Sequence, residues 1–76
     1  MKAFVLISLS TCDERVVLDE LKELEEVINA YILFGEWDIL AEIELDNAEQ
    51  LGSFVMEKIR SRKDVRLTSS LIVAGR

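Results

Sequence analysis

Apolar residues follow two different periods along the chain, and these periods alternate. A period of two with many β-branched residues predicts four strands, over residues 2–9, 27–34, 39–45 and 65–74. Apolar residues three and four positions apart predict two amphipathic helices. The first opens within residues 10–14 and ends at Glu25-Glu26, and the second begins near Asp46 or Asn47, with a buried stripe that reaches Ile59. The predicted order is strand, helix, strand, strand, helix, strand.

Polar residues mark the predicted start of each helix. Thr11 and Glu14 have capping-box spacing before the first helix, and Asp46 and Glu49 repeat that spacing before the second. Gly52 inside the second helix is about 1 kcal/mol less favourable than Ala, so we expect a close approach of this helix to another element. The predicted buried stripes are Val17, Leu18, Leu21 and Leu24 in the first helix, and Leu51, Phe54, Val55 and Ile59 in the second.

A short break separates the second and third strands near the middle of the chain. It reads Phe34-Gly35-Glu36-Trp37-Asp38 and predicts a β-hairpin. Two βαβ-like halves joined at a hairpin form the ferredoxin-like α+β fold, βαββαβ. This fold has one four-stranded antiparallel sheet with both helices on one face.

The sheet face without helices is predicted to be apolar. Its residues are Phe4, Leu6, Leu40 and Ile72, with Ile32 and Phe34 as further candidates. Burying each such side chain is worth about 1.5–3 kcal/mol, so four to six of them contribute on the order of 6–18 kcal/mol. We therefore expect a second copy to pack sheet to sheet with two-fold symmetry. The alternative is that the second or fourth strand bends over its own sheet.

Length and charge narrow the possible functions. The 76 residues allow one domain, residues 1–76, and 50% of them are hydrophobic, which excludes a disordered chain. A net charge of −6 argues against a direct nucleic-acid partner. The one basic stretch is interpreted as the last turn of the second helix, where cations are favourable. It contains Lys58, Arg60, Arg62, Lys63 and Arg66.

The chain has one Cys and no His. Cys12 alone forms no internal disulfide, which fits a reducing compartment, and a zinc or copper site is improbable. Nucleophile pairs that need His are excluded. The apolar start of the chain is too short to span a membrane. The sequence therefore predicts a cytoplasmic protein with no catalytic residues, no metal and no cofactor.

Several short motifs, spread over nearly the whole chain, resemble one family. They are Ala3 to Ile7, Leu24-Glu25-Glu26-Val27, Gly35-Glu36-Trp37-Asp38-Ile39, Leu51 with Phe54-Val55, and Val65 with Thr68, Ser70 and Ile72-Val73. Together they resemble the effector-binding RAM domain of the Lrp/AsnC transcriptional regulators. The chain differs in having Asp64 where the family usually has Gly, and Ser10-Thr11-Cys12 where Pro-Gly is frequent. It also starts at the first strand, without the family's helix-turn-helix, so the resemblance implies a stand-alone RAM protein.

The resemblance implies a module that binds small amino acids, forms homodimers and closes into a larger ring, an octamer or decamer, with the effector between dimers. It would act on amino-acid metabolism indirectly, without binding DNA itself, and full-length Lrp/AsnC regulators are possible partners. Six residues are assigned to the effector: Gly35, Glu36, Trp37, Asp38, Thr68 and Ser70.

The chemistry of these residues suits a zwitterion. Asp38 offers a negative charge to an ammonium group, and Gly35 lets backbone N–H groups approach a carboxylate. Thr68 and Ser70 offer hydroxyls and are expected on the open face with Asp38, while Trp37 and Phe34 are expected to wall the pocket. The simpler interpretation is that Gly35 shapes the turn and Asp38 braces it.

Two other functions remain open from the residues alone. The first is a structural assembly subunit that binds no ligand. The second is a cofactor-free enzyme of the dimeric α+β barrel type, in which Asp38, Glu42 or Glu44 would act as a base if burial raised its pKa.

Overall fold

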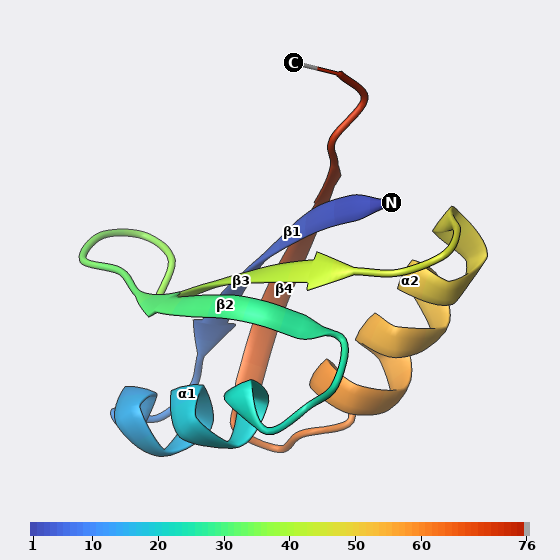
Figure 1. Cartoon of the computed structure of the whole chain (residues 1–76). Helices are drawn as coiled ribbons and strands as arrows, with labels where there is room; N and C mark the ends of the chain where they lie inside the picture. Colours follow the sequence, from blue (N-terminus) through green and yellow to red (C-terminus); the bar gives the residue numbers. More distant parts are fainter. Residues whose placement is uncertain (76) are drawn as a thin grey trace.

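The computed structural model describes residues 1–75 and confirms the βαββαβ order (Figure 1). A π-helical turn, η1, directly continues the second helix. The elements are β1 (Lys2–Leu9), α1 (Glu14–Lys22), β2 (Val27–Ile32), β3 (Ile39–Glu44), α2 (Ala48–Phe54), η1 (Val55–Ile59) and β4 (Val65–Ile72).

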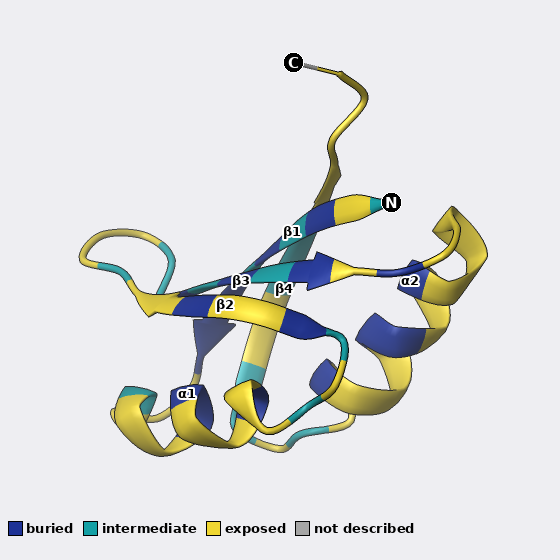
Figure 2. Cartoon of the chain, in the orientation of Figure 1, coloured by how far each residue is buried: buried dark blue, intermediate teal, exposed yellow. Residues whose placement is uncertain are grey.

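The strands form one four-stranded antiparallel sheet in the order β2-β3-β1-β4. Both helices lie on the same side of this sheet (Figure 1). This is the ferredoxin-like α+β arrangement that the sequence predicts. The inner strands β1 and β3 are mostly buried or half-buried, whereas the edge strands β2 and β4 are largely exposed (Figure 2).

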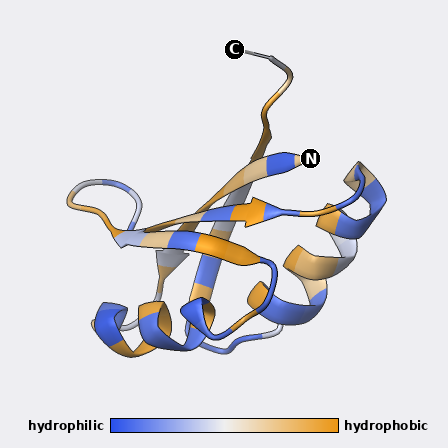
Figure 3. Ribbon diagram, in the orientation of Figure 1, coloured by the Kyte–Doolittle hydropathy of each residue, from blue (hydrophilic) through white to orange (hydrophobic). Residues whose placement is uncertain are grey.

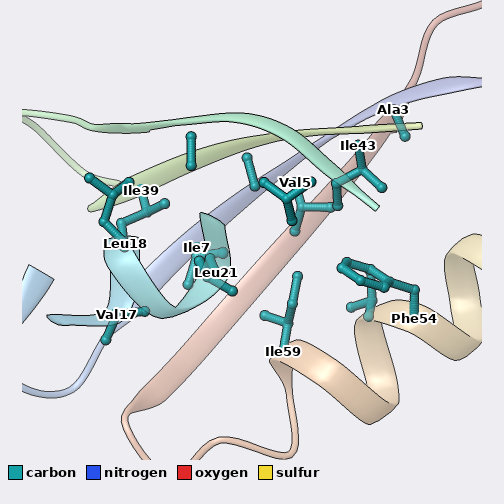
Figure 4. Packing of buried hydrophobic residues seen from close by; sticks show 14 of the residues in the cluster. Ala3, Val5, Ile7, Val17, Leu18, Leu21, Ile39, Ile43, Phe54 and Ile59 are labelled. Carbon is teal, nitrogen blue, oxygen red and sulfur yellow. The ribbon is translucent and has the colours of Figure 1, made fainter. Parts of the chain in front are cut away.

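The core lies between the sheet and the helix layer (Figure 4). Alternate residues of β1 and β3 supply the sheet side, including Val5, Ile7, Ile39 and Ile43, all 0% exposed. The helices carry apolar residues among polar ones (Figure 3). The predicted helical stripes are confirmed: Val17, Leu18, Leu21, Leu51, Phe54, Val55 and Ile59 are buried, and Leu24 packs against the core partly buried.

The helix starts differ from the predicted caps. Helix α1 has Asp13 as its N-cap and no side-chain capping bond, so the Thr11–Glu14 capping box is wrong. At α2 the N-cap is Asn47, whose side chain accepts a hydrogen bond from the N–H of Gln50 at 2.9 Å. Both shifts amount to one or two residues, because several polar residues near each start compete for the same role.

The second helix widens after its first two turns. The N–H of Arg60 donates to the carbonyl of Val55 at 2.7 Å, five residues back, which defines the π turn. A Cβ built on Gly52 would meet no atom within 4 Å, apart from its own chain neighbours and helix backbone. The close approach expected at Gly52 is therefore wrong, since this side of α2 faces open space.

Two β-bulges change which side chains share a face. In β4, Val65 lies opposite Leu9 but Leu67 lies opposite Ser8, so Arg66 is the extra residue. One extra residue moves every later side chain to the other face. Ile72 therefore lies opposite Ala3 on the helix side, and its predicted place on the open face is wrong.

The second bulge lies in β2, between Val27 and Asn29. As a result Ile32 pairs with Ile39 on the helix side, and Tyr31 pairs with Leu40 on the other side. The proposed place of Ile32 on the open face is thus also wrong. We define the open face by its apolar residues Phe4, Leu6, Tyr31, Leu40, Leu67 and Leu71.

The open face remains apolar after these corrections. Phe4, Leu6 and Leu40 are half-buried on it, as predicted. Tyr31, Leu67 and Leu71 are each about half exposed on this face. Besides the two isoleucines, the candidate Phe34 is also absent from it, because Phe34 lies in the connection between β2 and β3. The loss of three apolar residues is therefore offset by the gain of three, and the face keeps the character of an interaction surface.

Candidate functional site

The hairpin that connects β2 and β3 is formed as predicted, over residues 33–38. The N–H of Leu33 donates to the carbonyl of Asp38 at 2.8 Å, and the N–H of Asp38 donates to the carbonyl of Ile7 at 2.9 Å. Gly35 has φ of +149°, a conformation that residues with a Cβ rarely adopt. Phe34, next to it, is fully exposed. The hairpin is thus tied at its base to β1 and open at its tip.

The Asp38 carboxylate lies at the end of β1. Its Oδ2 accepts a hydrogen bond from the N–H of Leu9 at 2.7 Å. The side chain is partly buried, and within residues 1–75 it makes no ion pair. Asp38 therefore both braces the hairpin and presents a negative charge whose partner is a neutral amide.

A cation lies on the other side of the same strand end. Arg66 is the bulged residue of β4, and its Nη2 donates to Oγ of Ser8 at 2.8 Å. Ser8 is 3% exposed and precedes Leu9, the partner of Asp38. The interpretation of Arg66 as part of a helix end is wrong, because η1 ends at Ile59. A bulge leaves no signal in the apolar pattern, so the sequence does not reveal this neighbourhood.

The structure separates two of the predicted ligand residues from Asp38. Thr68 lies opposite Ile7 and Ser70 opposite Val5, so both are on the helix side of β4. Thr68 is half-buried there and Ser70 is exposed. Their expected place on the open face is wrong, and the cause is again the bulge at Arg66. Their role in effector binding stays a prediction that the single chain does not support.

The remaining hairpin residues differ in exposure. Trp37 is half-buried, whereas Gly35 and Glu36 are exposed. Two surface cavities, of about 550 and 420 Å³, contain none of these residues. The larger lies beside α2 and half of its lining residues are acidic, and the smaller is lined by Thr11, Arg62, Lys63 and Asp64. The predicted site therefore lies outside both of these cavities.

The two departures from the family pattern meet at the smaller cavity. The N–H of Ser10 donates to the carbonyl of Asp64 at 2.9 Å, and its Oγ donates to the same oxygen at 3.3 Å. Arg62 bridges Asp64, at 3.0 and 3.1 Å, and Glu20 of α1, at 2.6 Å. The hydrogen bond from Arg62 lowers the pKa of Asp64 despite its partial burial. These contacts join β1, α1 and β4, which is a structural role.

Of the carboxylates proposed as enzyme bases, Glu42 has its pKa shifted in the direction opposite to the one such a base needs. The pKa of Glu42 is lowered, first by a hydrogen bond from Asn29 at 3.2 Å and then by Lys2, whose Nζ lies 3.1 Å from Oε2. A lowered pKa makes a carboxylate a weaker base.

Within residues 1–75, no three potential ligands among His, Cys, Asp and Glu lie close enough to hold a metal ion. In the same part of the chain, no helix has the length and apolar character needed to cross a membrane.

The fold and the open apolar face are those of a small α+β domain with one uncovered side of its sheet. The chain belongs to the Lrp/AsnC family, since the model of the Lrp/AsnC ligand binding domain matches residues 2–76. It is 36% identical over 73 residues to an uncharacterised HTH-type transcriptional regulator of Pyrococcus furiosus. That match covers 92% of this chain and 49% of the regulator, so the chain spans about half the length of this curated relative.

Solved structures show the same fold. The crystal structure of FFRP-DM1 superposes with a TM-score of 0.89 at 35% identity, over 95% of this chain and 96% of that chain. The structure of Escherichia coli AsnC superposes with a TM-score of 0.90 at 26% identity, over 99% of this chain and 51% of AsnC. The first is similar to this chain over nearly its full length, and the second over about one half of its own length.

Proposed function

We propose that this chain binds a free amino acid at the base of the β2–β3 hairpin and couples that binding to its assembly state. The observation that carries the proposal is the Asp38 carboxylate, which is held at 2.7 Å from the Leu9 nitrogen and makes no ion pair with residues 1–75. A fixed carboxylate with residual negative charge is the group that an α-ammonium needs. Gly35, Glu36 and Trp37 form the rest of the proposed site on the same hairpin.

Assembly supplies the cover that the single chain lacks. The open face buries apolar surface if a second copy packs against it with two-fold symmetry, and we propose this homodimer as the basic unit. Dimers then close into a ring, an octamer or decamer, with the hairpins near the contacts between dimers. An effector bound at such a contact shifts the assembly equilibrium only by its difference in affinity between the two states.

The regulatory role follows from charge and relatives. A net charge of −6 disfavours direct contact with DNA phosphates. The curated relative is a transcriptional regulator about twice as long, whose further half lies outside the matched region. We propose that this chain acts in the cytoplasm on transcription of amino-acid metabolism, through co-assembly with regulators that carry the same domain.

A second candidate is an assembly subunit that binds no ligand. The bond between Asp38 and Leu9 favours it, since this bond gives Asp38 a structural task that needs no effector. The two candidates differ in one measurement. If the chain is an assembly subunit without a ligand, no amino acid should give a heat of binding. Its oligomeric state should then be the same with and without each amino acid.

The test is calorimetry of the purified chain with each of the twenty proteinogenic L-amino acids, together with light scattering. We expect saturable binding of one or a few amino acids and a change in molar mass on binding. Absence of binding for all twenty, with a constant molar mass, would contradict the effector-binding function and leave the assembly subunit.

A further inference from the structure

We propose that Arg66 is the carboxylate-binding residue of the effector site, opposite Asp38 across the end of β1. This inference rests on the proposed function, since it names the second half of the same site. It assigns to the site a residue from another strand, and it restricts the effector to molecules that carry both an ammonium and a carboxylate.

The first argument is position. Asp38 bonds to Leu9 from the β3 side of β1, and Arg66 bonds to Ser8 from the β4 side. Ser8 and Leu9 are consecutive, so their Cα atoms are about 3.8 Å apart. Strands β3 and β4 each lie about 4.8 Å from β1, on opposite sides of it, and both charged side chains reach inward to a group of β1. An α-amino acid carries its ammonium and carboxylate on one carbon, so a molecule lying over Ser8 and Leu9 would meet both side chains.

The second argument is charge. Within residues 1–75, Arg66 forms no ion pair, and the bond to Ser8 uses one nitrogen of a group with five N–H donors. Arg62 differs, because Glu20 and Asp64 already neutralise it. Asp38 likewise has a neutral partner. The strand end therefore presents one positive and one negative group, each still able to bind an opposite charge.

The third argument is preorganisation. Ser8 is 3% exposed, and its hydroxyl holds the Arg66 guanidinium at 2.8 Å. The bulge turns the Arg66 side chain toward Ser8, on the same side of β1 as the open face. A guanidinium restrained in this way binds a carboxylate through two parallel N–H···O bonds with less loss of side-chain entropy.

The experiment compares two variants and two probes by calorimetry at pH 6. The probes are the L-amino acid that the wild-type chain binds most tightly and the carboxamide of that amino acid, which keeps the ammonium but lacks the carboxylate. The α-amino groups of both probes are protonated at this pH, because their pKa values lie at about 8 or above. The variants are Arg66→Gln and, as matched control, Arg60→Gln, which removes an exposed charge beyond η1.

We expect Arg66→Gln to weaken binding of the amino acid by about ten- to a hundredfold, the usual effect of losing a charge-assisted bond. Binding of the carboxamide should be equally weak in wild type and Arg66→Gln, and Arg60→Gln should bind both probes as wild type does. Arg66→Lys keeps the charge without the planar fork and should recover part of the affinity.

Three results would overturn the proposal, and they are distinguishable. If the wild type binds an amino acid and Arg66→Gln binds it equally well, Arg66 is not part of the site and the proposed function stands. If Arg66→Gln weakens both probes by the same factor, Arg66 acts through the local fold and not through the carboxylate. If the wild type binds none of the twenty amino acids, the proposed function fails and this inference fails with it.

Discussion

Asp38 joins the hairpin to the central strand through its side chain, because its Oδ2 accepts a hydrogen bond from the N–H of Leu9 at 2.7 Å. Leu9 lies beyond the last residue pair between β1 and β3, which is Ile7 with Ile39, so strand pairing alone gives this N–H no acceptor. A buried unpaired N–H is unfavourable by about 1–3 kcal/mol. One carboxylate thus has a structural role and a proposed binding role, and substitutions can separate them.

Asp38→Asn should keep the structural role and remove the charge. The amide oxygen still accepts from Leu9, so we expect the free energy of unfolding to fall by less than about 1 kcal/mol. Affinity for the amino acid should fall at least about tenfold, because the ammonium loses a charged partner. Urea unfolding and calorimetry on the same preparation measure the two effects.

Asp38→Ala is the matched comparison, since it removes both the charge and the acceptor. We expect a loss of about 1–3 kcal/mol in unfolding free energy. If Asn and Ala destabilise equally, the bond to Leu9 does not brace the fold. If Asn retains wild-type affinity, the carboxylate charge is not what binds the effector.

The hydrophobic pattern predicts the helices and strands correctly, but it assigns several side chains to the wrong face of the sheet. The strand β1 was predicted at its observed bounds, and the buried stripes of both helices were confirmed. These segments are regular, so one period describes each of them. In β2 and β4 a bulge interrupts the period, and residues after it, such as Ile32 and Ile72, were assigned to the wrong face.

The candidate site was predictable only in its local part. Gly35 to Asp38 are consecutive, and their hairpin follows from the residues themselves. Arg66 and Ser8 meet across strands at an irregular position, so their contact depends on a bulge that the sequence pattern does not indicate. The error for Thr68 and Ser70 has the same origin.

Because of the bulge at Arg66, substitutions at the neighbouring residues Leu71 and Ile72 are expected to have different effects on dimer formation. Leu71 and Ile72 are similarly exposed, at 52% and 48%, but Leu71 lies on the open face and Ile72 on the helix side. Leu71→Glu would place a carboxylate in the two-fold interface, where burial of a charge is strongly unfavourable. We expect sedimentation velocity to show monomers for Leu71→Glu at concentrations where wild type and Ile72→Glu form dimers or larger assemblies.

Circular dichroism should show that both variants remain folded, since both side chains are half exposed. Equal dissociation by Leu71→Glu and Ile72→Glu would mean that the interface includes the edge of β4 and not only the open face. A folded Leu71→Glu dimer would argue against sheet-to-sheet association.

The Arg62 bridge predicts a pH-dependent contribution to stability. Because Arg62 lowers the pKa of Asp64, the bridge contributes fully above the unfolded Asp pKa of about 3.9 and is lost as pH falls through the lower folded value. The raised pKa of Arg62 affects only strongly alkaline solutions. Arg62→Gln should therefore reduce unfolding free energy by roughly 0.2–1 kcal/mol at pH 7, and by less once acid protonates Asp64 in the folded chain.

Lys63→Gln is the control for this prediction. It removes one positive charge from the next position, where the side chain is exposed. We expect Lys63→Gln to reduce the unfolding free energy less than Arg62→Gln does at pH 7. The small reduction caused by Lys63→Gln should not depend on the protonation of Asp64 in acid. If the two variants have the same pH profile, the effect reflects net charge and not the contacts of Arg62 with Glu20 and Asp64.

We predict opposite effects on stability when Gly35 and Gly52 are each replaced by alanine. A Cβ at either Gly35 or Gly52 would meet no atom within 4 Å, so neither alanine clashes with another residue. Gly35 has φ of +149°, and holding a residue with a Cβ in this region is unfavourable by about 1–3 kcal/mol. Gly52 lies inside α2, where Ala is favoured over Gly by about 0.5–1 kcal/mol.

We therefore expect Gly35→Ala to lower and Gly52→Ala to raise the midpoint of urea unfolding. The m-value, which is the slope of the unfolding free energy against urea concentration, should not change in either variant. Since Gly35 shapes the hairpin that carries Asp38, Gly35→Ala should also weaken amino-acid binding, whereas Gly52→Ala should not. A stable Gly35→Ala variant would show that the hairpin tip adopts another conformation without loss. The bond between Asp38 and Leu9 at its base would then be sufficient to hold the site.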